Sequence, residues 1–137
     1  MKRMFPRQLD SLDALFEWVG EFAATHGLDA DFLFSVNLAL EEAFVNTIRH
    51  NDSSTTDVEI GLEVDGRCLT VIVIDPDTDP FDLTKAGNVD TTRPAHERKP
   101  GGLGVFLIKR LMDDVTYEHS DRVSTIRMMK KLEPKNV

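Results

Sequence analysis

The strongest structural signal in the chain is a hairpin pattern in residues 57–75, DVEIGLEVDGRCLTVIVID. Apolar and polar residues alternate along 57–64, which is typical of a strand with one buried face. The Asp65-Gly66 pair then supplies the chemistry of a tight hairpin turn. The partner strand contains four consecutive apolar residues, 71–74, and such a run predicts burial on both faces.

Helical patterns stand on both sides of this hairpin. Apolar residues recur at helical spacing within 9–27, LDSLDALFEWVGEFAATHG. A second, longer helix is predicted to begin near residue 29 and to end between Asn51 and Ser54. A third helix is predicted from Leu103, in the segment LGVFLIKRLMDDV.

The remaining segments complete an α+β fold. Residues 1–8 are interpreted as a first edge strand or an arm, and 115–132 as a second hairpin that turns near 120–122. This order of elements predicts a two-layer sandwich, with a mixed, mostly antiparallel sheet and the helices on one face. Residues 82–100 are polar and show no period, and a loop of that length in a compact domain is usually functional or disordered.

Composition narrows the class of protein. A chain of 137 residues with 41% hydrophobic and 29% charged side chains is expected to form a single globular domain, 1–137. The net charge of −8 argues against a non-specific binder of nucleic acid or of anionic membranes. Cys68 is the single cysteine, so an internal disulfide is excluded and a cytoplasmic protein is expected. No signal peptide or apolar run of about 20 residues is visible.

A polar stripe interrupts the apolar surface of the second helix. Glu42, Asn46 and Arg49 are spaced i, i+4 and i+7, with His50 beside them, so they share one face. Such a stripe is most often the solvated side of a half-buried helix. It can also carry chemistry, because a carboxylate can deprotonate a hydroxyl group and an amide oxygen can bind a hard cation.

Three glycines, Gly101, Gly102 and Gly104, come just before the third helix. Unpaired backbone N–H groups and the positive end of the helix dipole favour a phosphate at such a place, and glycine lets the backbone approach it closely. The alternative is a flexible hinge into the helix. The segment is not a Walker P-loop, since no Gly-Lys-Ser/Thr sequence follows.

Taken in order, these elements resemble the boxes of the GHKL ATPase superfamily, and more closely the bacterial anti-sigma factors that are serine-protein kinases. The resemblance extends from about Leu9 to Leu132. The family's first box matches EAFVNTIRH at 42–50, and its last box matches GGLGVFLIKRLMDDVTY at 101–117. The resemblance implies a Bergerat-type ATP-binding fold that uses ATP and Mg²⁺.

The same resemblance implies roles for individual residues. Glu42 is then the base that activates the attacking hydroxyl group, and Asn46 is the magnesium ligand of the protein. Arg98, in a lid loop at about 82–100, reaches the γ-phosphate. The other implied nucleotide-binding residues are Arg49, His50, Asp75, Asp77, Gly101, the phosphate-holding backbone of Gly102, Leu103 and Gly104, and Ser124 or Thr125 facing the adenine, with Thr125 as the candidate.

The middle box departs from the family pattern. The family has Asp-x-Gly-x-Gly or Pro-Phe there, and its Asp accepts a hydrogen bond from the adenine amino group. The segment DPDTDPFD, which begins at Asp75, keeps the Asp and the Pro-Phe pair but carries Asp77 and Asp79 around the expected glycine positions, in a box one residue longer. Either Asp75 or Asp77 is available as the adenine partner. We expect ATP affinity about ten- to a hundred-fold below that of relatives with the glycines.

The resemblance also implies the partners. It indicates a homodimer that sequesters a sigma factor and phosphorylates a STAS-type anti-sigma-factor antagonist, with no direct contact to nucleic acid or membrane. The alternative is a non-catalytic partner-switching module of the same fold with weak or lost nucleotide binding. The substituted middle box favours that alternative, whereas the intact first and last boxes favour the kinase.

Overall fold

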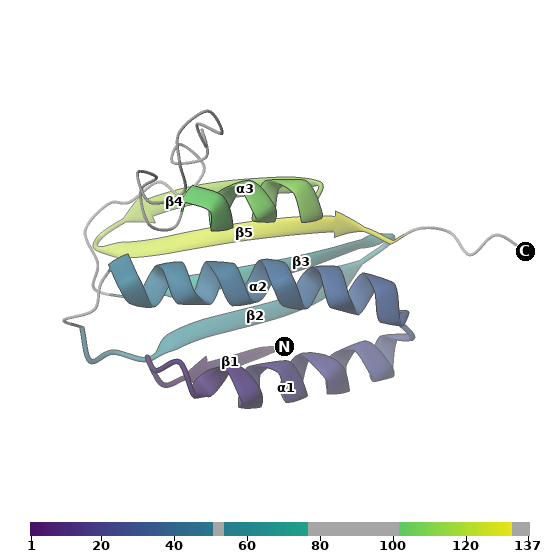
Figure 1. Cartoon of the computed structure of the whole chain (residues 1–137), viewed down its shortest axis with the longest axis horizontal. Coiled ribbons are helices and arrows are strands. Elements are labelled where there is room, and N and C mark those ends of the chain that lie inside the picture. The colour runs from purple at the N-terminus through teal and green to yellow at the C-terminus, as the bar shows by residue number, and fades with distance from the viewer. Residues whose placement is uncertain (51–53, 77–101, 133–137) are drawn as a thin grey trace, which may run out of the picture.

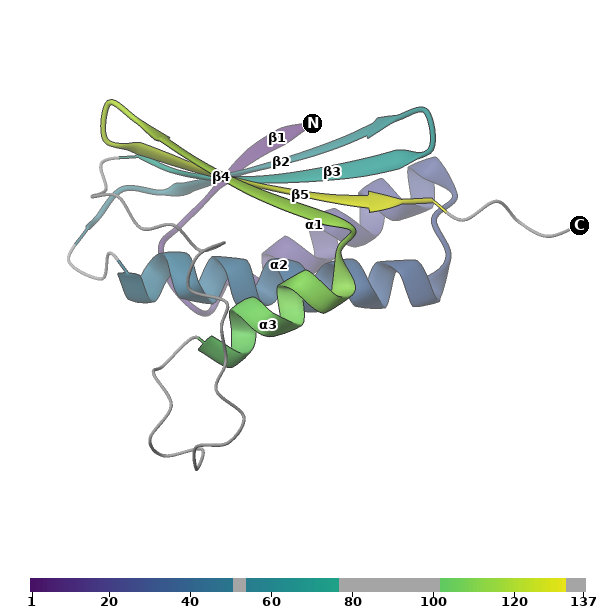
Figure 2. The same ribbon diagram turned by 90° about the horizontal axis from the view of Figure 1, so that it is seen from above.

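The protein is a two-layer α+β sandwich (Figure 1), seen in a computed structural model that describes residues 1–50, 54–76 and 102–132, with the backbone alone for 102–105. Figure 2 shows the sheet as one layer and all three helices as the other. The elements are β1 (Lys2–Phe5), α1 (Ser11–His26), α2 (Ala30–His50), β2 (Val58–Asp65), β3 (Cys68–Asp75), α3 (Gly102–Leu111), β4 (Asp114–Ser120) and β5 (Val123–Lys131).

The sheet has the strand order β1-β2-β3-β5-β4, and each pairing between described strands is antiparallel. The predicted α+β sandwich with helices on one face is therefore confirmed, while the described sheet is antiparallel instead of mixed. The reason lies in the strand order. Strand β4 runs in the same direction as β3, but β5 lies between them, so the two never pair.

Burial alternates along β3, contrary to the prediction of a strand covered on both faces. Val71 and Val73 are buried, but Ile72 and Ile74 are only half-buried. Antiparallel strands need only one covered face, and here the helices cover only one. The four apolar residues in a row therefore do not mark a strand buried on both sides.

The hydrophobic core lies between the two layers. Helix α1 contributes one apolar stripe and α2 another, and the inward side chains of β2, β3 and β5 meet them. The largest fully buried side chains are those of Phe5, Leu15, Val36, Leu40, Phe44, Val58, Ile60, Leu62, Leu69, Ile108 and Met128. Within the described ranges, no helix is long and apolar enough to cross a membrane.

Both predicted hairpin turns are present and use left-handed backbone. Gly66, between β2 and β3, has a φ of +61°, a conformation that glycine adopts at little cost. Asp121 and Arg122, between β4 and β5, have φ values of 51° and 64°. Two consecutive positive φ angles match the right-handed twist of the flanking strands. Each turn sets the register within its own hairpin, β2 with β3 and β4 with β5.

Candidate functional site

The predicted site residues that the structure describes gather at one end of the sandwich. Figures 1 and 2 show α3 beginning at the end of the molecule where α2 and β3 finish. Three predicted components therefore meet there: the polar stripe of α2, Asp75 at the end of β3, and the glycines at the start of α3.

The polar stripe of α2 divides into a buried part and an exposed part. Asn46 is only 9% exposed, and Glu42, one turn earlier, is half-buried. Arg49 and His50 are exposed in the last turn of the helix. A solvated stripe, the simpler interpretation of the sequence, therefore does not account for Asn46.

The side-chain amide of Asn46 is incompletely satisfied. Its Nδ2 is buried and has no hydrogen-bond partner among the described residues. An unpaired buried donor is costly, and native proteins seldom keep one without a use. The amide offers one donor group and one acceptor oxygen, which suit a phosphate oxygen and a hard cation respectively. The residues at this end thus fit a magnesium–phosphate group.

The start of α3 supplies the groups expected for phosphate. The helix begins at Gly102, one residue before the predicted start at Leu103, so Gly102, Leu103 and Gly104 form its first turn. The first four N–H groups of a helix have no acceptor within the helix. Together with the helix dipole they favour an anion at this position.

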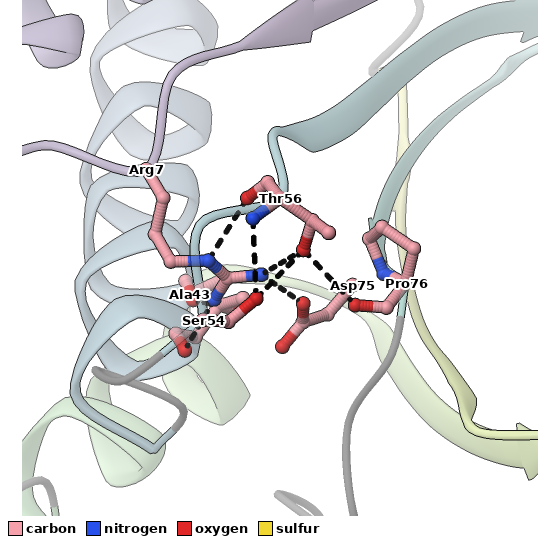
Figure 3. A network of polar contacts seen from close by, with 7 residues as sticks. Arg7, Ala43, Ser54, Thr56, Asp75 and Pro76 are labelled. Atoms are coloured by element: carbon pink, nitrogen blue, oxygen red, sulfur yellow. Dashed lines mark hydrogen bonds and ion pairs between the residues drawn. The ribbon is translucent and has the colours of Figure 1, made fainter.

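Asp75, the last residue of β3, is buried and already has a partner. It is 4% exposed and forms an ion pair with Arg7, which lies between β1 and α1. Figure 3 shows the guanidinium of Arg7 directed at this carboxylate and at Thr56. The sequence reasoning missed Arg7. No local pattern marks it, because its carboxylate partner is 68 positions away in the chain.

The register of β5 favours Ser124 over Thr125 as a neighbour of Asp75. Ser124 stands opposite Asp75, is buried, and lies 3.1 Å from the hydroxyl of Tyr117 through its Oγ. Thr125 stands opposite Ile74 and is half-buried. Because side chains alternate across a strand, Thr125 projects from the face of the sheet opposite to Asp75. Ser124 therefore shares the buried face of the sheet with Asp75, and Thr125, the predicted residue, does not.

The other predicted site residues, Asp77, Arg98 and Gly101, lie outside the described residues, as does the predicted lid at about 82–100. No group of three or more His, Cys, Asp or Glu side chains that could hold a metal occurs in the described part.

A separate cavity lies at the opposite end of the sandwich. Its volume is about 830 Å³, and it is bounded by the start of α2, the β2–β3 turn and the end of β5. None of the predicted site residues lines it. The chemistry argued above therefore belongs to the other end of the molecule.

The site and the fold define a class of protein. The family model of the histidine kinase-like ATPase domain matches residues 5–130. This match covers nearly the whole chain, and the chain belongs to the histidine kinase-like ATPase family.

Curated relatives within this class are named serine-protein kinase RsbW. The protein of that name from Listeria monocytogenes serovar 1/2a is 33% identical over 121 residues, covering 84% of this chain and 76% of the relative. The one from Bacillus velezensis is 31% identical over 121 residues, covering 84% and 74%. The resemblance to anti-sigma factors with serine kinase activity is thereby confirmed at the level of the family.

Solved structures share the fold. The RsbU and RsbW domains of Rv1364c from Mycobacterium tuberculosis match with a TM-score of 0.71 at 13% identity, over 98% of this chain and 33% of that chain. The SiaB–SiaC complex from Pseudomonas aeruginosa matches with a TM-score of 0.66 at 14% identity, over 94% and 88%. At such identities the likeness concerns the fold alone.

Proposed function

We propose that this protein is an ATP- and Mg²⁺-dependent protein-serine/threonine kinase that phosphorylates a STAS-type anti-sigma-factor antagonist and sequesters a sigma factor. The observation that carries the proposal is the buried side chain of Asn46, whose amide nitrogen is unpaired among the described residues and which lies at the end where α3 begins. The names of the RsbW relatives support the same activity. The proposal places the protein in the cytoplasm, as a homodimer of single-domain chains.

The proposed reaction is an in-line phosphoryl transfer. The hydroxyl oxygen of the partner's serine forms a bond to the γ-phosphorus while the bond to the β,γ-bridging oxygen breaks and ADP leaves. Glu42 accepts the hydroxyl proton. The amide oxygen of Asn46 would hold Mg²⁺, which neutralises charge on the phosphates. Backbone N–H groups in the first turn of α3 hold the phosphate oxygens.

Calorimetric titration with ATP, with and without Mg²⁺, tests this function. We expect saturable binding that requires Mg²⁺, followed by transfer of labelled γ-phosphate to an antagonist captured from the host lysate. A protein that binds no ATP at millimolar concentration with Mg²⁺ present would not be a kinase of this kind.

A second candidate function is a non-catalytic partner-switching module. The observation that favours it is the substituted middle box, DPDTDPFD from Asp75, which carries Asp77 and Asp79 around the positions where the family has glycines. The same titration separates the two candidates. Capture of the antagonist without any ATP binding supports the module and opposes the kinase.

A further inference from the structure

The side chain of Arg7 joins the segment between β1 and α1 to three others: α2, the residues before β2, and the end of β3. Its Nε donates to the carbonyl oxygen of Thr56 at 3.0 Å, and its Nη1 donates to the carbonyl oxygen of Thr47 at 3.4 Å. Its Nη2 donates to Thr56 Oγ1 at 3.3 Å and to Asp75 Oδ1. Figure 3 shows the guanidinium between α2 and the end of β3. All three nitrogen atoms are engaged, so the position of the side chain is fixed.

The carboxylate of Asp75 is fixed in turn. The side chains of Arg7 and Asp75 are 3% and 6% exposed, so water cannot easily replace either partner. With Oδ1 held by Arg7, the direction of Oδ2 is set as well, and no described residue donates a hydrogen bond to Oδ2. Thr56 Oγ1 donates to the carbonyl oxygen of Pro76 at 3.2 Å, which also restrains the residue after Asp75. The result is a hydrogen-bond acceptor with its orientation set before any ligand binds.

We propose that Arg7 is a positioning residue for base selectivity: by holding Oδ1 of Asp75, it directs Oδ2 toward the exocyclic amino group of adenine. This inference rests on the proposed function and assigns the adenine contact to Asp75. An ionised carboxylate only accepts hydrogen bonds. It therefore pairs with the amino group of ATP and gains nothing from a purine that carries only hydrogen at that position. An acceptor whose orientation is already set avoids the entropy cost of ordering it on binding.

Arginine is required for this role because of its shape. The planar fork of the guanidinium reaches Thr47, Thr56 and Asp75 together, whereas a lysine ammonium is a point charge on a flexible stem. The Arg7→Lys variant keeps the positive charge beside Asp75 but loses the fork. It is therefore expected to keep the charge balance of the buried pair and to lose the orientation of the carboxylate.

The test compares two nucleotides on two proteins. Affinities for ATP and for purine riboside triphosphate, which lacks the amino group, are measured with Mg²⁺ by calorimetry on the parent and on Arg7→Lys. We expect the parent to prefer ATP by about tenfold or more, which one oriented hydrogen bond can supply. In Arg7→Lys the preference should fall to about threefold or less. Arg3→Lys is the matched control, because Arg3 lies over the ring of Phe5, 5.1 Å from its centroid, and should leave the preference unchanged.

The outcomes separate this inference from the proposed function. Equal loss of affinity for both nucleotides in Arg7→Lys would make Arg7 purely structural and overturn the inference, and tighter ATP binding would show that Arg7 obstructs the site. A parent that binds both nucleotides equally would refute the inference and leave the kinase standing. A parent that binds neither refutes both. If Arg7→Lys does not fold, Arg7→Gln serves instead, since it also removes the fork that holds Oδ1 of Asp75, and an unchanged preference there overturns the inference.

Discussion

At the scale of single residues, the candidate site contains Asn46, a buried polar side chain with one atom unpaired among the described residues. Asn46 and Asn37 both lie on α2, and each has one buried side-chain polar atom without a partner among the described residues. Their spacing corresponds to about two and a half turns, so they project from opposite sides of the helix. Only Asn46 shares a face with Glu42. Asn37 is therefore a matched control for testing whether Asn46 takes part in ATP binding.

Replacement of Asn46 should abolish magnesium-dependent ATP binding. Asn46→Ala removes the proposed protein ligand for the cation, while the loss of an unpaired buried amide costs little stability. We expect no measurable Mg²⁺-dependent binding by calorimetry and a melting temperature within a few degrees of the parent. Asn37→Ala should bind Mg-ATP like the parent. Equal Mg-ATP affinity in the two variants would contradict the assignment.

Replacement of Glu42 should separate chemistry from binding. Glu42→Gln keeps the shape of the side chain and removes the proposed base, a change that typically costs about 10² to 10⁴ in rate. We expect ATP and antagonist to bind normally and phosphate transfer to fall by that factor in a single-turnover assay. Glu41→Gln is the control, since Glu41 is equally half-buried but points about 100° away around the helix. Transfer at the parental rate in Glu42→Gln would reduce Glu42 to a surface residue.

The sequence predicted these α2 residues because their spacing is local, but it could not predict their environment. Helical periodicity places Glu42 and Asn46 on one face without saying whether that face is covered. The burial of Asn46 depends on the tertiary packing of α2, which its local sequence does not specify. Arg7 was beyond sequence reasoning for the same reason, since every partner of its side chain is at least 40 positions away.

At the scale of helices and strands, most elements could be predicted from the local sequence. Turn residues and alternation predicted both hairpins, and apolar spacing predicted the three helices. The error in β3 concerned which faces are covered, which depends on the layer arrangement and not on the strand itself. The choice of Thr125 over Ser124 failed for a similar reason. Two adjacent strand residues face opposite sides of the sheet, and only the pairing of Ser124 with Asp75 shows which of them faces the helices.

Two glycines test whether local backbone preference determines these elements, because replacing each by alanine should change the free energy of unfolding in opposite directions. Gly66 occupies the β2–β3 turn at a φ of +61°, and Gly20 lies within α1; an added Cβ would meet nothing within 4 Å at either. Gly66→Ala should lower the free energy of unfolding by about 1–2 kcal/mol because of its left-handed backbone. Gly20→Ala should raise it by about 0.5–1 kcal/mol because alanine favours the helix. Urea denaturation checks both, and a shift of the same sign in the two variants would refute the local account.

At the scale of the whole molecule, the Arg7–Asp75 pair ties the start of the chain to the middle strand of the sheet. Arg7 precedes α1, whereas Asp75 ends β3, which is the third strand in the order. A buried ion pair between such distant segments forms only when both layers are assembled. It therefore couples the integrity of the proposed adenine contact to the folding of the entire domain.

This coupling is measurable as a double-mutant cycle on stability. Arg7→Met and Asp75→Leu should each cost about 3–5 kcal/mol, because each leaves one charge buried without its partner. The double variant replaces the pair with apolar side chains and should recover at least half of the summed loss, with the remainder owed to the carbonyl oxygens of Thr47 and Thr56 that lose a donor. Urea midpoints at constant m-value give the three numbers. Strictly additive losses would show that the two charges are stabilised independently, and the long-range tie between the N-terminal segment and the end of β3 would have to be abandoned.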